Sequence, residues 1–150
     1  MRKREKTTES GEDRLIARYF KPLARHPGAF GLIDDAAVLA PPPGHELVLK
    51  TDAIVGGVHF FADDPADAVA RKALRVNLSD LASKGAQPAG FLLTLALPKG
   101  VGDRWLKPFA RGLGSALVCY CVHGFLLSPS QYHLHVFRVS YSVQLSFIKE

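Results

Sequence analysis

Carboxylates stand at the ends of several predicted elements, where they could hold a metal ion. These residues are Asp34, Asp35, Asp52 and Asp80. Thr51 and Ser79 each place a hydroxyl beside one of these carboxylates. Magnesium prefers carboxylate and hydroxyl oxygens, a few per ion, with water completing its shell. The residue types therefore predict a magnesium site.

Each acidic residue also has a purely structural explanation. The Asp34–Asp35 pair could form a turn, and Asp52 could cap a loop by bonding its own backbone. Asp80 could pair with Lys84, four residues further along a helix. From the residues alone, both explanations stay open.

Two further polar residues lie among apolar neighbours. His59 lies near the end of the segment "AIVGGVHF", where a buried histidine with its hydrogen bonds satisfied is more typical than a ligand. Asn77 begins a polar stripe that continues through Asp80 and Lys84 at helical spacing. The apolar face beside this stripe consists of Leu74, Leu78 and Leu81.

The elements that must position these residues alternate between helix and strand. Apolar residues at helical spacing predict a helix from Gly11, and "ELVLKTD" predicts a strand over 46–52. The segment 53–60 is expected to be a second strand, bent at its two glycines. Asp64 is the expected cap of the next helix, Pro65 its first residue and Gly85 its end.

The second half of the pattern continues in the same way. The run "GFLLTLALP" predicts a strand buried on both faces, and a further helix begins at Asp103. The fold class is α/β (α+β), a mixed sheet flanked by helices.

Composition narrows the class of protein. The 150 residues suit one domain, and 47% hydrophobic with 22% charged residues is ordinary for a globular chain. The net charge is +5, but no aromatic residues are interleaved with the basic ones, so no nucleic-acid partner is expected. No apolar run reaches the roughly 18 residues of a membrane helix, and no secretion signal is seen. We expect a cytoplasmic protein with free thiols at Cys119 and Cys121, and disorder over residues 1–10.

The composition changes after Leu117. Residues 118–150 contain three charged residues and six of the fourteen aromatic ones. Strict alternation of apolar and polar residues over 137–147 predicts a strand. This tail is either aberrant sequence that follows a truncation near Leu117, which we favour, or a replacement strand that closes the sheet.

Five motifs occur in an order that carries more information than any one of them. They are "GEDRLIARYF", "GLIDDAAVL", "KTDAIVGGVHF", "ADAVARKALRVNLSDLASKGAQPAGFLLTLALP" and "WLKPFARGL". From Gly11 to Leu117 the chain closely resembles the N-terminal domain of thiamine-phosphate kinase, also called thiamine-monophosphate kinase. That kinase is part of the aminoimidazole ribonucleotide synthetase-like superfamily.

The resemblance implies a reaction. ATP phosphorylates thiamine monophosphate to thiamine diphosphate by direct, magnesium-assisted transfer, with no covalent intermediate and no catalytic side chain. It also implies a homodimer formed through the sheet, for which Leu92, Leu93, Leu95 and Leu97 are available.

The resemblance also assigns roles to residues of this chain. Asp35, Thr51, Asp52 and Asp80 become magnesium ligands, and His59 becomes a substrate contact. The expected supporting residues are Asp34, Lys50 and Asn77.

Three departures from the family pattern bear on activity. Ile33 replaces a glycine of the family pattern. If that position needs a positive φ, the β-branched isoleucine would be strained there. Lys50 replaces a serine or threonine, and its ammonium could face phosphate or displace one metal ion. The Gly-Gly-Asp-Thr segment and the second domain of the family do not follow residue 117.

These departures leave alternatives to an active kinase. One is a catalytically inactive remnant that serves as a dimerisation or binding module. Another is a different ATP-binding enzyme of the same superfamily. Selenophosphate synthetase is disfavoured because no cysteine precedes Cys119.

Overall fold

The computed structural model describes the backbone of residues 11–120, 123–126 and 142–149, and the side chains of residues 11–117. The chain begins with consecutive short helical segments, an α-helix, a π-helix and two 3-10 helices, and continues with longer helices and strands. In order these are α1 (Gly11–Leu15), η1 (Ile16–Phe20), η2 (Lys21–Leu23), η3 (Pro27–Leu32), β1 (Leu49–Val55), α2 (Ala66–Ser83), β2 (Pro88–Ala96), α3 (Asp103–Tyr120), β3 (His123–Leu126) and β4 (Ser142–Lys149).

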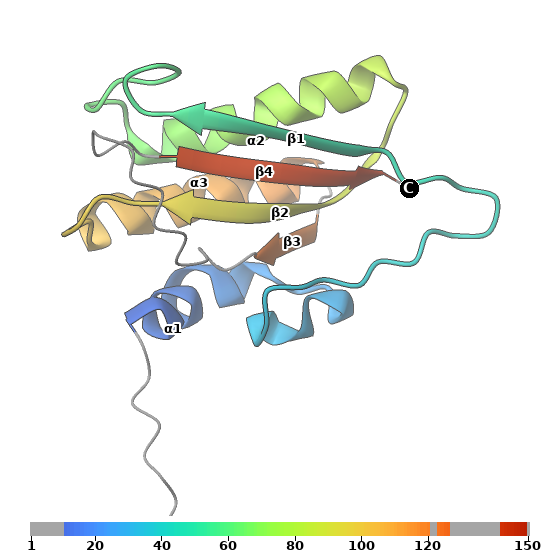
Figure 1. Cartoon of the computed structure of the whole chain (residues 1–150), viewed down its shortest axis with the longest axis horizontal. Helices are drawn as coiled ribbons and strands as arrows, with labels where there is room; N and C mark the ends of the chain where they lie inside the picture. Colours follow the sequence, from blue (N-terminus) through green and yellow to red (C-terminus); the bar gives the residue numbers. More distant parts are fainter. Residues whose placement is uncertain (1–10, 121–122, 127–141, 150) are drawn as a thin grey trace, which may run out of the picture.

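The strands form one mixed sheet in the order β1-β4-β2-β3. β4 is antiparallel to both of its neighbours, whereas β2 and β3 are parallel. Figure 1 shows α2 and α3 side by side on one face of this sheet, with the N-terminal helical segments next to β3. This architecture confirms the predicted fold class.

The strand predicted within the tail is present as β4. It begins at Ser142, so the residues from Phe137 to Tyr141 fall outside the described part. β4 lies between β1 and β2, with Gln144 opposite both Ala53 and Thr94. A strand that closes the sheet would occupy this position. The division of the chain at residue 117 stays a prediction.

The core lies between the sheet and the two long helices. Val69, Leu74 and Leu81 of α2 and Phe109 and Leu113 of α3 are all buried. The helices approach closely at Gly112, where a Cβ atom would lie 2.6 Å from the carbonyl oxygen of Asp67. Only glycine permits this contact between the two backbones.

β2 differs from the expectation of burial on both faces. Phe91, Leu93 and Leu95 are buried, but Leu92 and Thr94, which alternate with them, are only half-buried. Side chains of a strand point to its two faces in turn, and α2 and α3 cover only one of them. The prediction was therefore wrong for one face.

The boundaries of α2 confirm one predicted signal and correct another. Gly85 has a φ of 64° just beyond the helix, as expected of a C-terminal glycine. Asp64 is not the cap, because its Oδ2 accepts a hydrogen bond from the Phe61 amide at 2.8 Å. Pro65 precedes the first helical residue rather than occupying that position. Asp67 lies in the first turn, and the nearby Arg71 guanidinium, 2.8 Å away, lowers the pKa of its carboxyl group.

The first strand also begins and ends differently from the prediction. β1 starts at Leu49, three residues later than expected, and continues through Val55 as one strand. The expected second strand is instead a tight turn at Gly57, where φ is 78°, closed by a Gly56–Phe60 bridge. Within the described ranges, no helix combines the length and the apolarity that crossing a membrane requires.

Candidate functional site

Lys50 joins two of the predicted site carboxylates. Its Nζ atom lies 2.8 Å from Oδ2 of Asp80 and 3.8 Å from Oδ2 of Asp52. The hydrogen bond that the Lys50 ammonium donates to Asp80 raises the pKa of Lys50, and this effect exceeds the opposing effect of desolvation. Asp80 thus pairs with Lys50, and the alternative pairing with Lys84 is wrong.

Strand geometry explains how Lys50 and Asp52 come to face Asp80. Residues two apart in a strand share a face, so Lys50 and Asp52 lie on the same side as Ile54, which is buried in the core. That side is the one that α2 covers, and Asp80 belongs to α2. Thr51 falls on the opposite face by the same alternation, so its hydroxyl and the Asp52 carboxylate are directed apart.

Asp52 also bonds backbone. Its Oδ1 atom accepts a hydrogen bond from the Ala53 amide at 2.9 Å. The structural explanation, that this aspartate bonds its own backbone, is therefore correct for one of its two oxygens. The other oxygen faces Lys50.

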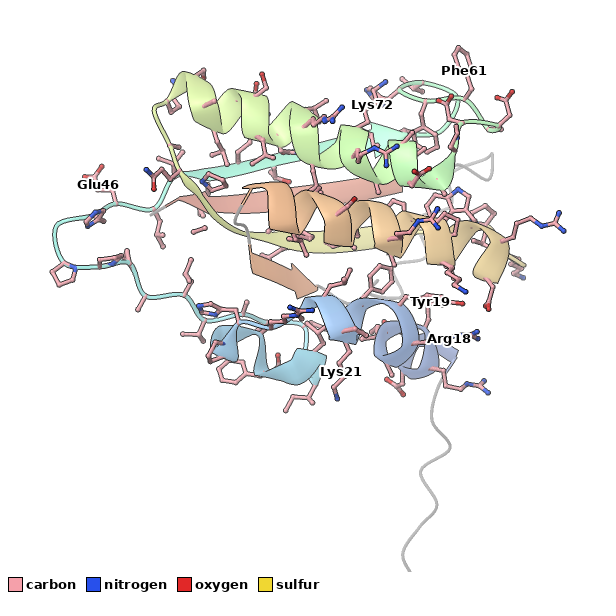
Figure 2. The ribbon with its side chains drawn as sticks, turned by 180° about the vertical axis from the view of Figure 1, so that it is seen from behind. Arg18, Tyr19, Lys21, Glu46, Phe61 and Lys72 are labelled. Carbon is pink, nitrogen blue, oxygen red and sulfur yellow. The ribbon has the colours of Figure 1, made fainter. Side chains whose placement is uncertain are left out.

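His59 sits on the exposed turn that follows β1, not in the core. Its Nδ1 accepts a hydrogen bond from the Val55 amide at 3.0 Å, and its carbonyl oxygen accepts one from the Lys72 ammonium. Figure 2 places Lys72 and the exposed Phe61 at this end of the molecule. A neutral imidazole that accepts at Nδ1 carries its proton on Nε2. His59 therefore has an Nε2–H donor on an exposed turn.

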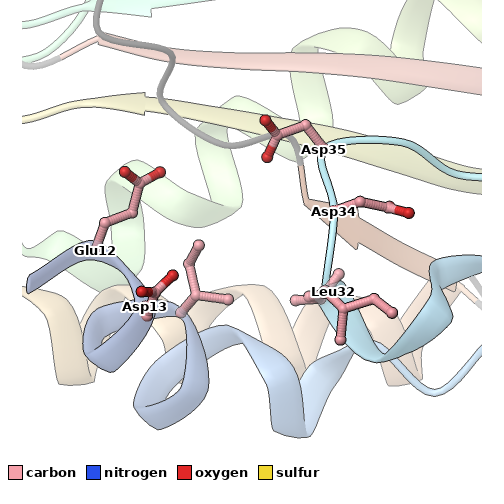
Figure 3. Close-up of a pocket in the computed structure, with 7 residues that line it drawn as sticks. Glu12, Asp13, Leu32, Asp34 and Asp35 are labelled. Carbon is pink, nitrogen blue, oxygen red and sulfur yellow. The ribbon is translucent and has the colours of Figure 1, made fainter. Parts of the chain in front are cut away.

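Asp34 and Asp35 lie elsewhere, at an acidic pocket of about 150 Å³. Figure 3 shows Glu12 and Asp13 of α1 on one side of it and Asp34 and Asp35 on the other. Asp34 also accepts a hydrogen bond from the Ala36 amide at 3.1 Å, which confirms the predicted turn there. Sequence reasoning missed Glu12 and Asp13 because acids at a helix start are usually explained by the helix dipole.

The backbone that leads into this pocket is unusual, but not at Ile33. Ile33 has a φ of −94°, so the strain considered for a residue in place of glycine is absent. Positive φ values occur instead at Phe30, Gly31 and Leu32. Two of these three residues are not glycine, and the left-handed conformation is unfavourable for them.

Asn77 is fully buried and does not share an exposed stripe with Asp80. Its Nδ2 donates to the Ala73 carbonyl oxygen at 2.9 Å, within its own helix. Its Oδ1 is buried and, within the part of the chain that is described, accepts no hydrogen bond. The supporting role of Asn77 stays a prediction.

The predicted magnesium ligands do not converge on one position. Across residues 11–117, no three histidine, cysteine or acidic side chains gather closely enough to hold a metal ion together. Asp52 and Asp80 meet at Lys50, while Asp35 lines the separate acidic pocket. The oxygen ligands suit a magnesium ion that arrives with a nucleotide, since such an ion needs one or two carboxylates. They do not form a cage made by the protein alone.

Comparison with known proteins identifies the family. The family model of "AIR synthase related protein, N-terminal domain" matches residues 33–124, which is more than half of the chain. The chain belongs to this family.

Curated relatives of this AIR synthase-related domain are kinases by name. Thiamine-monophosphate kinase of Caulobacter vibrioides is 52% identical over 99 residues, 65% of this chain and 28% of that protein. The Escherichia coli K12 protein of the same name is 47% identical over 113 residues, 73% of this chain and 34% of that protein. The resemblance seen in the motifs is thereby confirmed. The chain spans about a third of the length of these relatives.

Solved structures agree with the family. Thiamine-monophosphate kinase from Stenotrophomonas maltophilia superposes with a TM-score of 0.64 at 31% identity, over 91% of this chain and 40% of that one. A ThiL protein complexed with AMPPCP and TMP gives 0.57 at 29% identity, over 81% and 42%. Hydrogenase maturation protein HypE in complex with ATP gives 0.69 at 19% identity, over 96% and 41%, and so shares the fold.

Proposed function

We propose that this chain carries the N-terminal part of a thiamine-monophosphate kinase site, which uses ATP to phosphorylate thiamine monophosphate to thiamine diphosphate. The observation that carries the proposal is the match to proteins of that name over 65% and 73% of this chain. The ThiL structure with AMPPCP and TMP supports the same pair of substrates. The chain spans about a third of the length of these relatives, and turnover by this chain alone is the part of the proposal that the experiment below tests.

The proposed reaction is a direct transfer. An oxygen of the thiamine monophosphate phosphate forms a bond to the γ-phosphorus of ATP as the bond from that phosphorus to the β-bridging oxygen breaks. ADP leaves with the electron pair of the broken bond. Such a transfer depends on positioning and on charge stabilisation rather than on a protein nucleophile.

In this proposal, the described side chains bind and orient the phosphates. His59 donates from Nε2 to the substrate, from a turn held by its bonds to Val55 and Lys72. Magnesium ions that arrive with ATP would neutralise phosphate charge, and Asp35, Thr51, Asp52 and Asp80 are proposed to hold them from separate positions rather than around one ion. Asp34, Lys50 and Asn77 are proposed to support this set.

The proposed homodimer would use the face of the sheet that α2 and α3 leave uncovered. Of the leucines expected at this interface, Leu93 and Leu95 are buried on the side that faces the helices. The expectation that these two contact a partner is therefore wrong. Leu92 alternates with them and is half-buried, so it is the residue of β2 that suits this surface. A cytoplasmic location belongs to the same proposal.

A binding module without turnover is the second candidate. It is favoured by Lys50, whose ammonium lies between the Asp52 and Asp80 carboxylates that would otherwise hold a magnesium ion. The two candidates differ in whether a folded chain converts thiamine monophosphate, and both predict binding of a ligand or partner.

Calorimetric titration of the purified chain with a non-hydrolysable ATP analogue tests the proposal. Runs with and without magnesium are followed by thiamine monophosphate and by a turnover assay. We expect magnesium-dependent nucleotide binding that weakens in Asp52→Asn and Asp80→Asn. Glu46→Gln, which removes an exposed acid of the preceding loop (Figure 2), is the matched control and should bind like the wild type.

The outcomes separate the candidates. Unchanged nucleotide binding in both site variants would show that these carboxylates have been assigned wrongly. Binding without turnover would favour the module. A folded wild-type chain that binds neither nucleotide nor thiamine monophosphate would refute the kinase site.

A further inference from the structure

The Lys50 ammonium lies between carboxylates that belong to different elements. Asp52 is on β1, two residues from the lysine, and Asp80 is on α2. The Lys50 side chain is 29% exposed, whereas those of Asp52 and Asp80 are 52% and 56% exposed. The cation is thus more enclosed than the two anions that it bridges.

Two carboxylates directed at one position need a positive charge between them. Without one, their repulsion would disfavour this arrangement of the two side chains, and a divalent cation is the usual solution. Here the ammonium provides that charge and hydrogen-bonds to Asp80. Two cations of α2 are engaged elsewhere: Arg71 pairs with Asp67, and Lys72 bonds the His59 carbonyl oxygen.

A metal ion at the same position would meet the ammonium directly. Magnesium binds oxygen at about 2.0–2.1 Å, so an ion held by Asp52 and Asp80 would occupy the space of Lys50 Nζ. Two positive charges only a few ångströms apart repel each other even in water. The ion and the lysine therefore exclude each other from this position.

We propose that Lys50 is a built-in substitute for one divalent cation, and that it arranges Asp52 and Asp80 before any metal arrives. The inference deepens the proposed function and rests on it, because it sets how many magnesium ions the phosphate site takes. Lys50 is a positioning residue in this role. The wild-type chain therefore takes one magnesium ion fewer than its Lys50→Thr variant.

The test measures magnesium binding alone, without nucleotide, by calorimetry and by thermal unfolding of the full chain. Lys50→Thr and Lys50→Met each remove the ammonium, and Met keeps much of the aliphatic stem. We expect both to bind one magnesium ion at least about tenfold more tightly than the wild type. Their melting temperatures should rise with magnesium, whereas that of the wild type should respond less.

Two controls connect the gain to this position. Lys50→Arg keeps the positive charge and should show no gain. Lys50→Thr combined with Asp80→Asn removes a carboxylate and should abolish the gain. If neither Lys50→Thr nor Lys50→Met acquires magnesium-dependent stabilisation, the proposal is overturned. It is equally overturned if, in the absence of nucleotide, Asp80→Asn lowers magnesium binding in a chain that retains Lys50.

This test can fail independently of the proposed kinase site. Loss of nucleotide binding by the wild type would refute the proposed function, whatever Lys50 does. An unaltered magnesium response in the Lys50 variants, with intact nucleotide binding, would refute only the substitution of a cation by lysine.

Discussion

Arg18 and Asp103 form an ion pair with 2.6 Å between Nη2 and Oδ2. The hydroxyl group of Tyr19, the neighbour of Arg18, donates a hydrogen bond to the other oxygen of the same carboxylate. Asp103 is the first residue of α3, where a negative charge also suits the helix dipole. Figure 2 shows Arg18 and Tyr19 on the N-terminal helical segment beside this end of α3. The aspartate therefore fastens that segment to the helix.

The hydrogen bond from Tyr19 to Asp103 makes tyrosine ionisation a measure of this contact. The bond raises the pKa of Tyr19 above 10.0, mainly because the neutral hydroxyl is the donor. A raised pKa in the folded state means that the stabilisation is present below pH 10.0 and is lost as pH rises through the folded value. In Asp103→Ala, the alkaline absorbance titration should show one tyrosine with a lower pKa. Tyr19→Phe identifies that tyrosine, and identical titrations in Asp103→Ala and wild type would contradict the contact.

Gly112 is predicted to be intolerant of any side chain. A methyl group there would lie 2.6 Å from the Asp67 carbonyl oxygen and 3.0 Å from the Ala70 Cβ, so α2 and α3 would have to separate. We expect Gly112→Ala to lower the free energy of unfolding by about 1–3 kcal/mol. Denaturant titration would measure it. Gly114→Ala is the control on the same helix, because its methyl group meets only the end of the flexible Leu23 side chain.

Gly28 supports the loop that carries Asp34 and Asp35. A Cβ atom there would lie 1.8 Å from the Val38 carbonyl oxygen, and the Gly28 carbonyl oxygen accepts a bond from the Val38 amide at 2.9 Å. Gly28→Ala should therefore displace the loop, lower the melting temperature and weaken magnesium-dependent nucleotide binding. Gly102→Ala, whose methyl group would meet nothing within 4 Å, should leave both properties near those of the wild type. Equal behaviour of the two variants would contradict the supporting role of Gly28.

The central position of β4 predicts a strong effect of proline. Gln144 lies opposite Ala53 on one side and Thr94 on the other, and proline cannot donate a hydrogen bond to the ladder. Gln144→Pro should abolish cooperative unfolding or lower the melting temperature steeply, measured by circular dichroism. Gln144→Ala keeps the amide and should unfold cooperatively. If the proline variant resembles the alanine variant, β4 does not pair as a central strand.

Local patterns predicted the two long helices but not the contacts between distant residues. The helical spacing of Leu106, Phe109 and Leu113 predicted α3, because residues three or four apart lie on one face of a helix and are buried together. The position of Gly85 predicted the end of α2 for an equally local reason. Both predictions concern residues that are close in the sequence.

The candidate site depends on contacts between distant residues, which spacing alone does not reveal. Lys50 stood out only as a departure from a family pattern, and nothing local shows that its ammonium meets Asp80. The capping prediction for Asp64 failed similarly, since the carboxylate bonds the Phe61 amide on the preceding turn. Asp35 and Asp52 were expected to belong to one site. In the structure Asp35 lines the acidic pocket, whereas Asp52 faces Lys50.

The place of β4 has a consequence for the order in which the protein folds during synthesis. β1 and β2 are synthesised early, but they do not pair with each other. Each pairs with β4 instead, as Leu49 of β1 does with Ile148 of β4. While the ribosome is still translating residues 97–141, β1 and β2 each have an unpaired edge toward the position that β4 later fills. Exposed edges of this kind recruit other strands. The nascent chain is therefore most open to chaperones, and to mispairing with a second nascent chain, until residue 149 has left the ribosome.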